Sequence, residues 1–360
     1  MQRLRLPVGV LLGLFIALSA ASAEPLVRHD YAALRLKPKA AQPLLDSFFD
    51  HRAGRAAYVV VRVTVGANGK ATQAHAVRGF FIPAQALSAE KFAMALVWEP
   101  KTIDGTPVES SGEISLRFWL PDVEFVPQAV LDSLKEAARH ISARDWPAAL
   151  ARLDRMEANE ITSISSYMMV ESLRAAVYDG KGDYPQALRH ARLALACQME
   201  GATAIPPLMV AQTMIRTMGL ERQLGLYSDA LKTWDELQKF DSKSATPALA
   251  QEAAAVRALV TGDEAISNWL ELDDQGVQSM SVFRSTVAVD SGDAGSLDEA
   301  TLQCWPTDSA PGHSGRYEYE LPPKQTAWEI PAATKDCSLT LKGKPGTRLK
   351  IIQSGAAAVL

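Results

Sequence analysis

Alternation of apolar and polar residues is clearest between positions 58 and 120, where it predicts antiparallel strands around one helix. In the segment YVVVRVTV one face consists of four valines, Val59, Val61, Val63 and Val65. This is the period of a half-buried strand. Asn68-Gly69 follows in a position suited to a tight hairpin turn, because both residues tolerate positive φ angles. A second strand is expected over 71–77.

The rest of this region predicts a helix and a last strand. AQALSAEKFAMALVW, after Pro83, has helical spacing of its apolar residues, with Ser88 as the candidate N-cap. Asp104-Gly105 marks a turn. Residues 112–120 then alternate, and their apolar side consists of Ile114, Leu116, Phe118 and Leu120. The order of elements is strand, hairpin, strand, helix, strand.

This order and six spaced residues resemble the C-terminal domain of the TonB family over about residues 55–121. The matching residues are Gly69, Trp98, Pro100, Gly105, Pro107 and Val108. Two departures stand out: LSAEKF replaces the family's Leu-Asp before the helix, and the Gln-Pro segment of energy transducers is missing before Tyr58.

The resemblance implies that the last strand, 112–120, presents an unpaired edge to which an extended peptide from an outer-membrane receptor or plug is added. The expected partner-binding residues are Gly112, Ser115, Arg117 and Trp119. For Trp119 we favour contact with another domain over a role in a binding face.

Between about 127 and 262 the apolar period becomes helical. RDWPAALARLDRM, GDYPQALRHARLAL and GLYSDALKTWDELQ share an aromatic followed three residues later by an alanine. These alanines, Ala149, Ala187 and Ala230, lie 38 and 43 residues apart. The pattern resembles divergent tetratricopeptide repeats. In the middle unit, small Ala187 is expected to let helices approach while Tyr184 fills the space beside it.

His140 and Glu221 replace the usual aromatic of the first helix in the outer repeat units. PALAQEAAAVRALVTGD predicts one further helix that caps the stack.

Beyond Ala265, short strand-like segments separated by turn residues predict a small β-sandwich or barrel. Cys304 and Cys337 are expected to form a disulfide there. Cys197 lies in a helical pattern, where a small buried side chain is favoured over a reactive thiol.

The predicted fold class is therefore multidomain, with an α+β TonB-like domain, an all-α helical-repeat domain and a C-terminal all-β domain. The expected segments are a signal peptide at 1–23, a linker at 24–51 with a short helix at 43–50, and domains at 52–122, 127–264 and 265–360.

Export is expected from the N-terminal pattern. Arg3 and Arg5 precede an apolar run at 8–20, and Ala21-Ser22-Ala23 forms a small-residue cleavage site. The run is shorter than the roughly 20 residues that span a bilayer. We therefore expect a cleaved precursor in the periplasm, with inner-membrane anchoring by an uncleaved segment as the alternative.

No pattern in the chain points to an enzyme, a metal or a cofactor. The six histidines have no H-x-x-x-H or H-E-x-x-H spacing, and no C-x-x-C occurs. GHSG, with His313 and Ser314, lacks the spacing of a nucleophile elbow. LKGKPGT is interpreted as a hairpin, and Asp273-Asp274 as a solvated turn. The net charge of -4 argues against nucleic acid.

The expected function is that of a non-enzymatic periplasmic protein that binds envelope proteins or peptides by strand addition and through its helical repeats. The alternative is an atypical TonB-type energy transducer, anchored in the inner membrane and acting in outer-membrane transport. Two further alternatives stay open: a hydrolase centred on GHSG, and a variant in which the last strand is buried against the helices.

Overall fold

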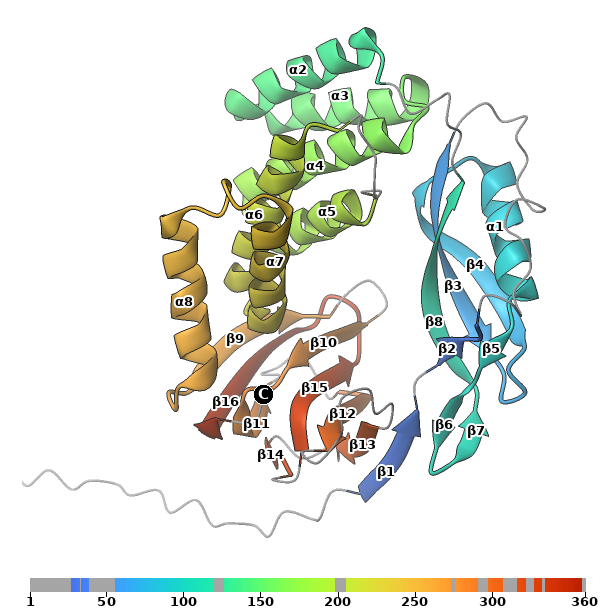
Figure 1. Cartoon of the computed structure of the whole chain (residues 1–360), viewed down its shortest axis with the longest axis vertical. Helices are drawn as coiled ribbons and strands as arrows, with labels where there is room; N and C mark the ends of the chain where they lie inside the picture. The colour runs from blue at the N-terminus through green and yellow to red at the C-terminus, as the bar shows by residue number, and fades with distance from the viewer. Residues whose placement is uncertain are drawn as a thin grey trace, which may run out of the picture.

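The computed structural model describes residues 27–32, 34–38, 56–118, 126–197, 205–272, 276–290, 297–306, 316–321, 327–331 and 334–357. Figure 1 shows a narrow sheet flanked by one helix, a stack of helices, and further sheets below that stack. Helices and antiparallel sheets thus occur together in this multidomain chain.

The narrow sheet has three strands in the order β4-β3-β8. The chain supplies β3 (Ala57–Val65), β4 (Ala71–Phe80), α1 (Pro83–Ala95) and β8 (Ser110–Phe118). The four valines of the predicted apolar face are buried in one cluster with Ala89, Phe92 and Ala93 of α1. Burial of this face holds the helix on the sheet.

Two boundaries in this region differ from the sequence prediction. β4 runs to Phe80, beyond 77, and α1 begins at Pro83, with Ile82 rather than Ser88 as its N-cap. The Gln85 side chain accepts a hydrogen bond of 3.1 Å from the Ile82 amide. Proline fits the first helical turn, because its missing N–H has no intrahelical acceptor there.

The helical stack consists of successive antiparallel hairpins (Figure 1). Its helices are α2 (Gln128–Ser142), α3 (Trp146–Asn159), α4 (Ile164–Lys181), α5 (Tyr184–Ala196), α6 (Pro207–Gln223), α7 (Tyr227–Phe240) and α8 (Pro247–Thr261). The three segments of shared pattern form α3, α5 and α7. Ala175 and Ala187, which are both fully buried, pack in one cluster with Tyr178 and Tyr184.

A buried glutamate paired with a partly exposed arginine stands at one of the positions where the repeat pattern lacks its aromatic. Glu221 of α6 is buried and accepts hydrogen bonds from Arg192 and from the Thr233 hydroxyl, each at 2.8 Å. Burial raises the pKa of the Glu221 carboxyl, and the bonds from Arg192 and Thr233 act in the opposite direction. Polar pairing thus replaces aromatic packing between these helices.

Two antiparallel sheets lie below the helices. Their C-terminal strands are β9 (Ile266–Glu271), β10 (Val277–Ser281), β11 (Arg284–Asp290), β12 (Glu299–Pro306), β13 (Arg316–Leu321), β14 (Ala327–Glu329), β15 (Thr334–Lys342) and β16 (Arg348–Ala357). One sheet has the order β14-β11-β16-β9. Its Val287 and Ile351 share a buried cluster with Leu302 and Leu339 of the other sheet.

The interpretation of LKGKPGT as a hairpin is wrong. β15 pairs with β10 and β12, whereas β16 pairs with β11 and β9, so residues 343–347 cross from one sheet to the other. Turn residues predict a change of direction, but they do not say which strand the chain pairs with next.

The larger sheet has the order β10-β15-β12-β13-β1-β6-β7, and three of its strands come from the first third of the chain. They are β1 (Val27–Ala32), β6 (Lys101–Ile103) and β7 (Thr106–Val108). β1 pairs with β13 on one side and with β6 on the other. The C-terminal sheets are therefore completed by segments outside 265–360.

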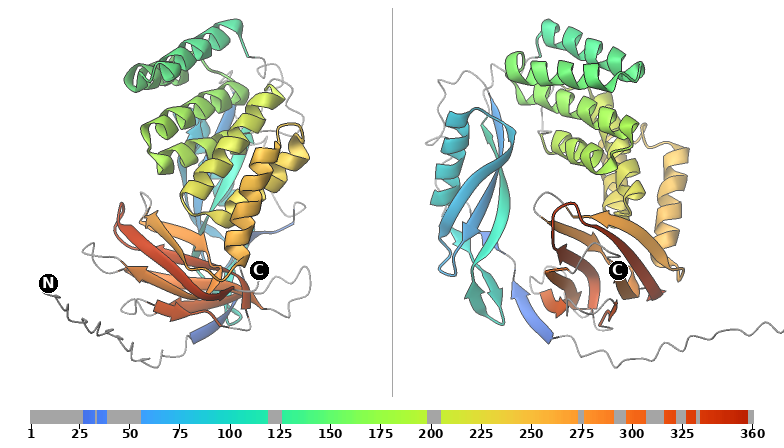
Figure 2. Two further views of the ribbon diagram at one scale, coloured as in Figure 1. Left: turned by 90° about the vertical axis from the view of Figure 1, so that its left-hand side faces the viewer. Right: turned by 180° about the vertical axis from the view of Figure 1, so that it is seen from behind.

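The segment 24–51, which the sequence predicts to be a linker with one short helix, contains two strands, β1 and β2. Besides β1, the pair β2 (Arg35–Leu36) and β5 (Trp98–Glu99) forms a short ribbon. The helix expected at 43–50 and the signal peptide at 1–23 lie outside the described residues. Figure 2 shows β1 leading from the C-terminal sheets towards the three-stranded sheet.

A buried arginine joins the helical stack to the four-stranded sheet. Arg284, at the start of β11, is fully buried, and its guanidinium donates to the carbonyls of Leu259 at 2.6 Å and Val260 at 2.8 Å. These carbonyls belong to the last turn of α8, where helical C=O groups lack intrahelical donors. The positive charge also suits the negative end of the helix dipole.

Replacing this arginine tests the junction. Arg284→Met leaves the α8 carbonyls without donors, so we expect the free energy of unfolding to fall by about 3 kcal/mol in urea denaturation. Arg348→Met is the matched control, because Arg348 is exposed and lies over the Trp269 ring. An equal effect of the two variants would contradict the assigned role of Arg284.

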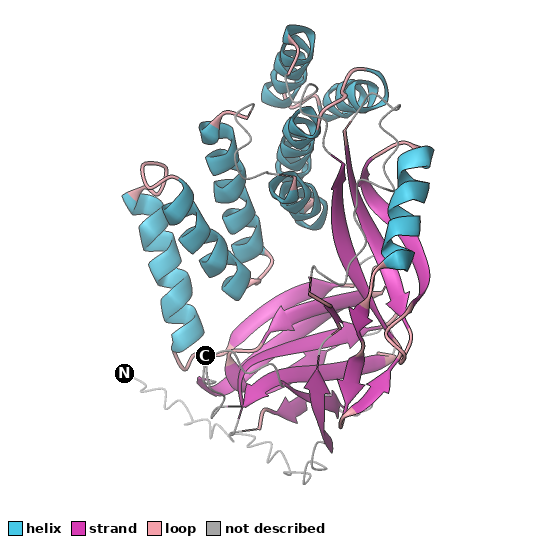
Figure 3. Cartoon of the chain, turned by 45° about the vertical axis from the view of Figure 1, so that its right-hand side comes forward, coloured by secondary structure: helices cyan, strands magenta, loops and turns pink. Residues whose placement is uncertain are grey.

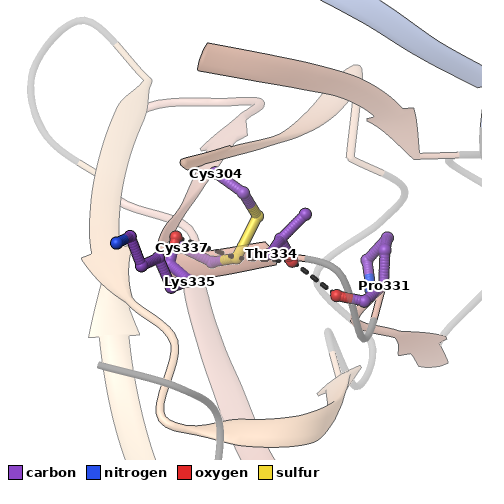
Figure 4. Close-up of a disulfide and its surroundings, with 5 residues drawn as sticks. All are labelled: Cys304, Pro331, Thr334, Lys335 and Cys337. Atoms are coloured by element: carbon purple, nitrogen blue, oxygen red, sulfur yellow. Dashed lines mark hydrogen bonds between the residues drawn. A yellow bond between two sulfur atoms is a disulfide. The ribbon is translucent and has the colours of Figure 1, made fainter. Parts of the chain in front are cut away.

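The predicted disulfide is present. Cys304 of β12 and Cys337 of β15 are joined at an S–S distance of 2.05 Å and are both buried (Figure 4). They lie 33 residues apart, and the loop that they close contains β13 and β14. The bond therefore restricts a long loop in the unfolded chain.

Removal of this bond should destabilise the C-terminal sheets. For Cys304→Ala/Cys337→Ala we expect a loss of about 3 to 4 kcal/mol in the free energy of unfolding, mainly because the unfolded chain gains entropy. Wild-type protein in dithiothreitol should lose the same amount, and Cys197→Ala should remain sensitive to reductant. A double variant as stable as oxidised wild type would contradict this account.

Candidate functional site

The edge of the three-stranded sheet at β8 is the main candidate site. β8 pairs with β3 from Val65↔Ser110 to Ala57↔Phe118, and this register is unbroken over all nine pairs. Among the described residues, no strand pairs with the opposite side of β8. Every second residue of an antiparallel edge strand points its N–H and C=O away from the sheet, so the outward backbone groups of residues 110–117 have no partner strand in the described part of the chain.

The polar side chains of β8 form hydrogen bonds and ion pairs with residues of β3 and β4. The Ser111 hydroxyl lies 3.1 Å from that of Thr64, and the Ser115 hydroxyl lies 3.0 Å from that of Tyr58. Glu113 accepts hydrogen bonds from both Arg62 and Arg78. These bonds direct the three side chains toward β3 and β4, away from the outer edge of β8.

The opposite edge of the same sheet, β4, is irregular. Its register with β3 shifts twice, between Val60 and Val61 and between Thr64 and Val65. The Ala76 amide also donates to the Glu90 carboxylate of α1 at 2.9 Å. Bulges and side-chain caps of this kind protect a sheet edge from pairing with another chain.

The edges of the two larger sheets are shorter where the structure describes them. β7, at the end of the seven-stranded sheet, has three residues and contains Pro107, which has no N–H to donate. β10 has five residues, β9 six and β14 three. β8, with nine, is the longest described edge with regular pairing.

Three of the TonB-like motif residues meet at one point. A β-carbon on Gly69 would lie 2.6 Å from the Trp98 carbonyl oxygen and 3.5 Å from Pro100, and Gly69 has a φ of +74°. The Trp98 amide donates to the Gly69 carbonyl at 3.2 Å. Gly69 therefore allows the hairpin turn to contact the segment that leads to β6.

The other motif residues form the β6-β7 hairpin. Asp104 and Gly105 both have positive φ at its turn, as the sequence predicts, and Pro107 lies on its outer strand. This hairpin belongs to the seven-stranded sheet, and Glu109 alone separates its strand β7 from β8, so the motif joins the two sheets.

The four expected partner-binding residues have different surroundings. Gly112 lies close to the Leu34 side chain: a β-carbon at position 112 would lie 3.2 Å from it. Ser115 bonds to Tyr58, and the Arg117 guanidinium donates to the Ala196 carbonyl of α5 and lies 5.9 Å from the centre of the Tyr58 ring. The side chains of Ser115 and Arg117 thus make internal contacts, while their backbone belongs to the edge. Trp119 lies outside the described residues.

Contacts between the sheet and the helices fix the position of the edge. Phe80 stacks on Tyr167 of α4 with ring centres 5.1 Å apart, and the Ala56 amide donates to the Thr162 carbonyl at 3.0 Å. Tyr58 and Val60 belong to the same buried cluster as the helices. The face of the three-stranded sheet opposite α1 thus meets the helical stack through buried side chains (Figure 3).

A groove of about 780 Å³ in the helical stack is a second candidate site. Residues of α2, α4 and α6 line this groove, together with Tyr184 of α5. Its apolar residues include Ile141, Leu173 and Ile215, and an ion pair of 3.4 Å joins Arg216 to Asp179. This size and mixed lining suit a small molecule or an extended segment. The sequence pattern did not single out Arg216, because the curvature that forms the groove depends on helix packing.

The described residues contain one free thiol and no cluster of side chains suited to a metal. No cluster of three or more His, Cys, Asp or Glu side chains suited to a metal occurs among these residues. Cys197 is buried, and burial raises the pKa of its thiol, which disfavours the reactive thiolate. His313, Ser314, Asp273 and Asp274 lie outside the described residues.

Comparison with known proteins adds no assignment: no family model matches the chain, and no similar curated protein is found. Within the described ranges, no helix has both the length and the apolar character needed to cross a membrane.

Substitution of two motif glycines by alanine tests the close contact between Gly69 and Trp98. Gly69→Ala places a β-carbon against the Trp98 carbonyl, so we expect a loss of about 3 kcal/mol or more in unfolding free energy. Gly105→Ala is the matched control, since Gly105 has the same φ of +74° but nothing within 4 Å of its β-carbon position. Its cost should be about 1 kcal/mol. Equal losses in thermal unfolding would contradict the proposed packing.

Proposed function

We propose that this protein is a non-enzymatic binding protein of the cell envelope that captures an extended segment of a partner by strand addition at β8. The observation that carries the proposal is the nine-residue edge, which is regularly paired on one side only among the described residues. The TonB resemblance assigns the same role to this strand. The partner is a periplasmic or outer-membrane protein with an exposed extended segment.

The geometry of β8 supports recognition through the backbone. At about 3.4 Å per residue, nine residues offer an edge of roughly 30 Å. Because Ser111, Glu113 and Ser115 bond inward, an added strand meets mostly amide and carbonyl groups. Binding of this kind accepts varied sequences, and its selectivity depends on alternate side chains of the partner.

The groove between α2, α4 and α6 supports a second binding role for the same protein. α4 contributes Ser172, Leu173 and Ala176 to the groove, while Tyr167 near its beginning contacts the three-stranded sheet. One helix therefore connects the two candidate sites. A partner with two segments would gain affinity if it occupied both sites together.

A proline in β8 tests strand addition. Ser115→Pro disturbs the outer edge, and we expect at least a tenfold loss of affinity for ten-residue peptides selected from a displayed library on the wild-type chain. Ser115→Thr is the matched control, because it retains the hydroxyl and favours strand conformation. Affinity is measured by fluorescence polarisation.

Hydrogen exchange provides the second measurement in case Ser115→Pro unfolds the sheet. In wild-type protein, the outward amides of 110–117 should exchange quickly when free and slowly when a selected peptide is bound. Peptides that bind without slowing these amides, or that bind Ser115→Pro unchanged, would overturn the proposal.

A further inference from the structure

The two faces of the three-stranded sheet differ in chemistry along β8. Ile114 and Leu116 pack in one cluster with side chains of α1. Because side chains alternate along a strand, Glu113, Ser115 and Arg117 point to the opposite face. A strand added to β8 continues both faces of the sheet, so its own side chains alternate between these two environments.

The face towards α1 is apolar at the margin of the sheet. Ile114 is only partly buried, and it packs against the buried cluster that includes Leu116. The Leu34 side chain lies beside Gly112 on this face and packs against the same cluster. An added strand therefore buries more apolar surface if each of its residues that points towards this face is apolar.

The opposite face carries an excess of positive charge. The charged residues of β3, β4 and β8 are three arginines and one glutamate, namely Arg62, Arg78, Arg117 and Glu113. With histidine counted as neutral, three positive charges and one negative charge leave +2 on these strands, in a chain of net charge -4. We call the side of the sheet that carries these residues the arginine face.

The charges of the arginine face are balanced unevenly. The Glu113 carboxylate is shared by Arg62 at 2.9 Å and Arg78 at 2.5 Å, so two guanidinium groups face one carboxylate. Arg117 donates to the Ala196 carbonyl, and no carboxylate in the described part of the chain forms an ion pair with it. The edge strand itself therefore carries a negative charge that is already paired and a positive charge that is not.

We propose that the segment captured by β8 alternates acidic with apolar side chains. This inference rests on the strand addition proposed above and names the chemistry of the partner. The apolar side chains of the segment pack beside Ile114 and Leu34, and its Asp or Glu side chains lie on the arginine face next to Arg117. Side chains directly opposite or diagonal on neighbouring strands lie about 5 to 8 Å apart, which is within reach of an arginine.

Basic and uncharged segments fit the same edge less well. Lysine side chains of a partner would meet Arg117, and like charges on neighbouring strands destabilise their pairing. Hydroxyl side chains would meet Ser111 and Ser115, whose hydroxyls already lie within hydrogen-bond distance of hydroxyls on β3. Charge complementarity therefore favours the acidic segment.

Three peptides test this selectivity by fluorescence polarisation at low salt. Each has ten residues, with valine at every second position and aspartate, threonine or lysine at the positions between. We expect the aspartate peptide to bind about fivefold more tightly than the threonine peptide and about twentyfold more tightly than the lysine peptide. Salt at about 0.5 M should reduce both differences, because it screens exposed charges.

Substitutions on β8 should change the affinity for the aspartate peptide in opposite directions. Arg117→Gln removes a positive charge and should weaken binding about threefold, whereas Arg117→Lys should retain it. Glu113→Gln removes the negative charge and should strengthen binding about threefold. Arg348→Gln, at an exposed arginine of β16 outside the three-stranded sheet, is the matched control and should leave the affinity unchanged.

The possible outcomes separate the acidic preference from strand addition itself. Equal binding of the three peptides, each weakened by Ser115→Pro, would overturn the acidic preference and leave strand addition in place. An aspartate peptide that binds Ser115→Pro as well as the wild-type chain would overturn both, because charge alone would then hold the peptide. Failure of all three peptides to bind would also overturn both. Circular dichroism of each variant distinguishes weaker binding from loss of fold.

Discussion

Backbone hydrogen bonding between strands far apart in the sequence is the constraint on which this structure depends. β1 pairs with β13 across almost the whole chain, and β8 pairs with β3 across the intervening helix α1. Buried amide and carbonyl groups need partners, so each strand must find a neighbour or face water. β8 pairs with β3 on one side, and no described strand pairs with its other side.

The remaining contacts determine where this edge lies. Arg284 holds α8 on the four-stranded sheet, while Phe80 and Tyr167 hold the three-stranded sheet on α4. β1 and the β6-β7 hairpin join the same sheet to the C-terminal strands. The edge is thus fixed between a helical stack and a second sheet, instead of belonging to a unit that moves freely at the end of a linker.

The β8 edge and the groove in the helical stack differ in the groups that they present to a partner. The outer side of β8 presents backbone groups, whereas the groove between α2, α4 and α6 has a mixed apolar and polar lining. α1 covers one face of the three-stranded sheet, and the helices meet the other. The three-stranded sheet is thus held between α1 and the helical stack.

The sequence by itself determined local structure. Alternation located the valine face of β3, the repeat pattern located α3, α5 and α7, and Asp104-Gly105 located a turn. These features depend on near neighbours and on side-chain period. Only the tertiary structure decided that β1 belongs to the C-terminal sheet, that Ser115 and Arg117 bond inward, and that β8 rather than β4 is the regular edge. The physical reason is that strand pairing and bulges depend on residues that only folding brings together. The alternation of side chains along one strand does not specify which strand lies beside it.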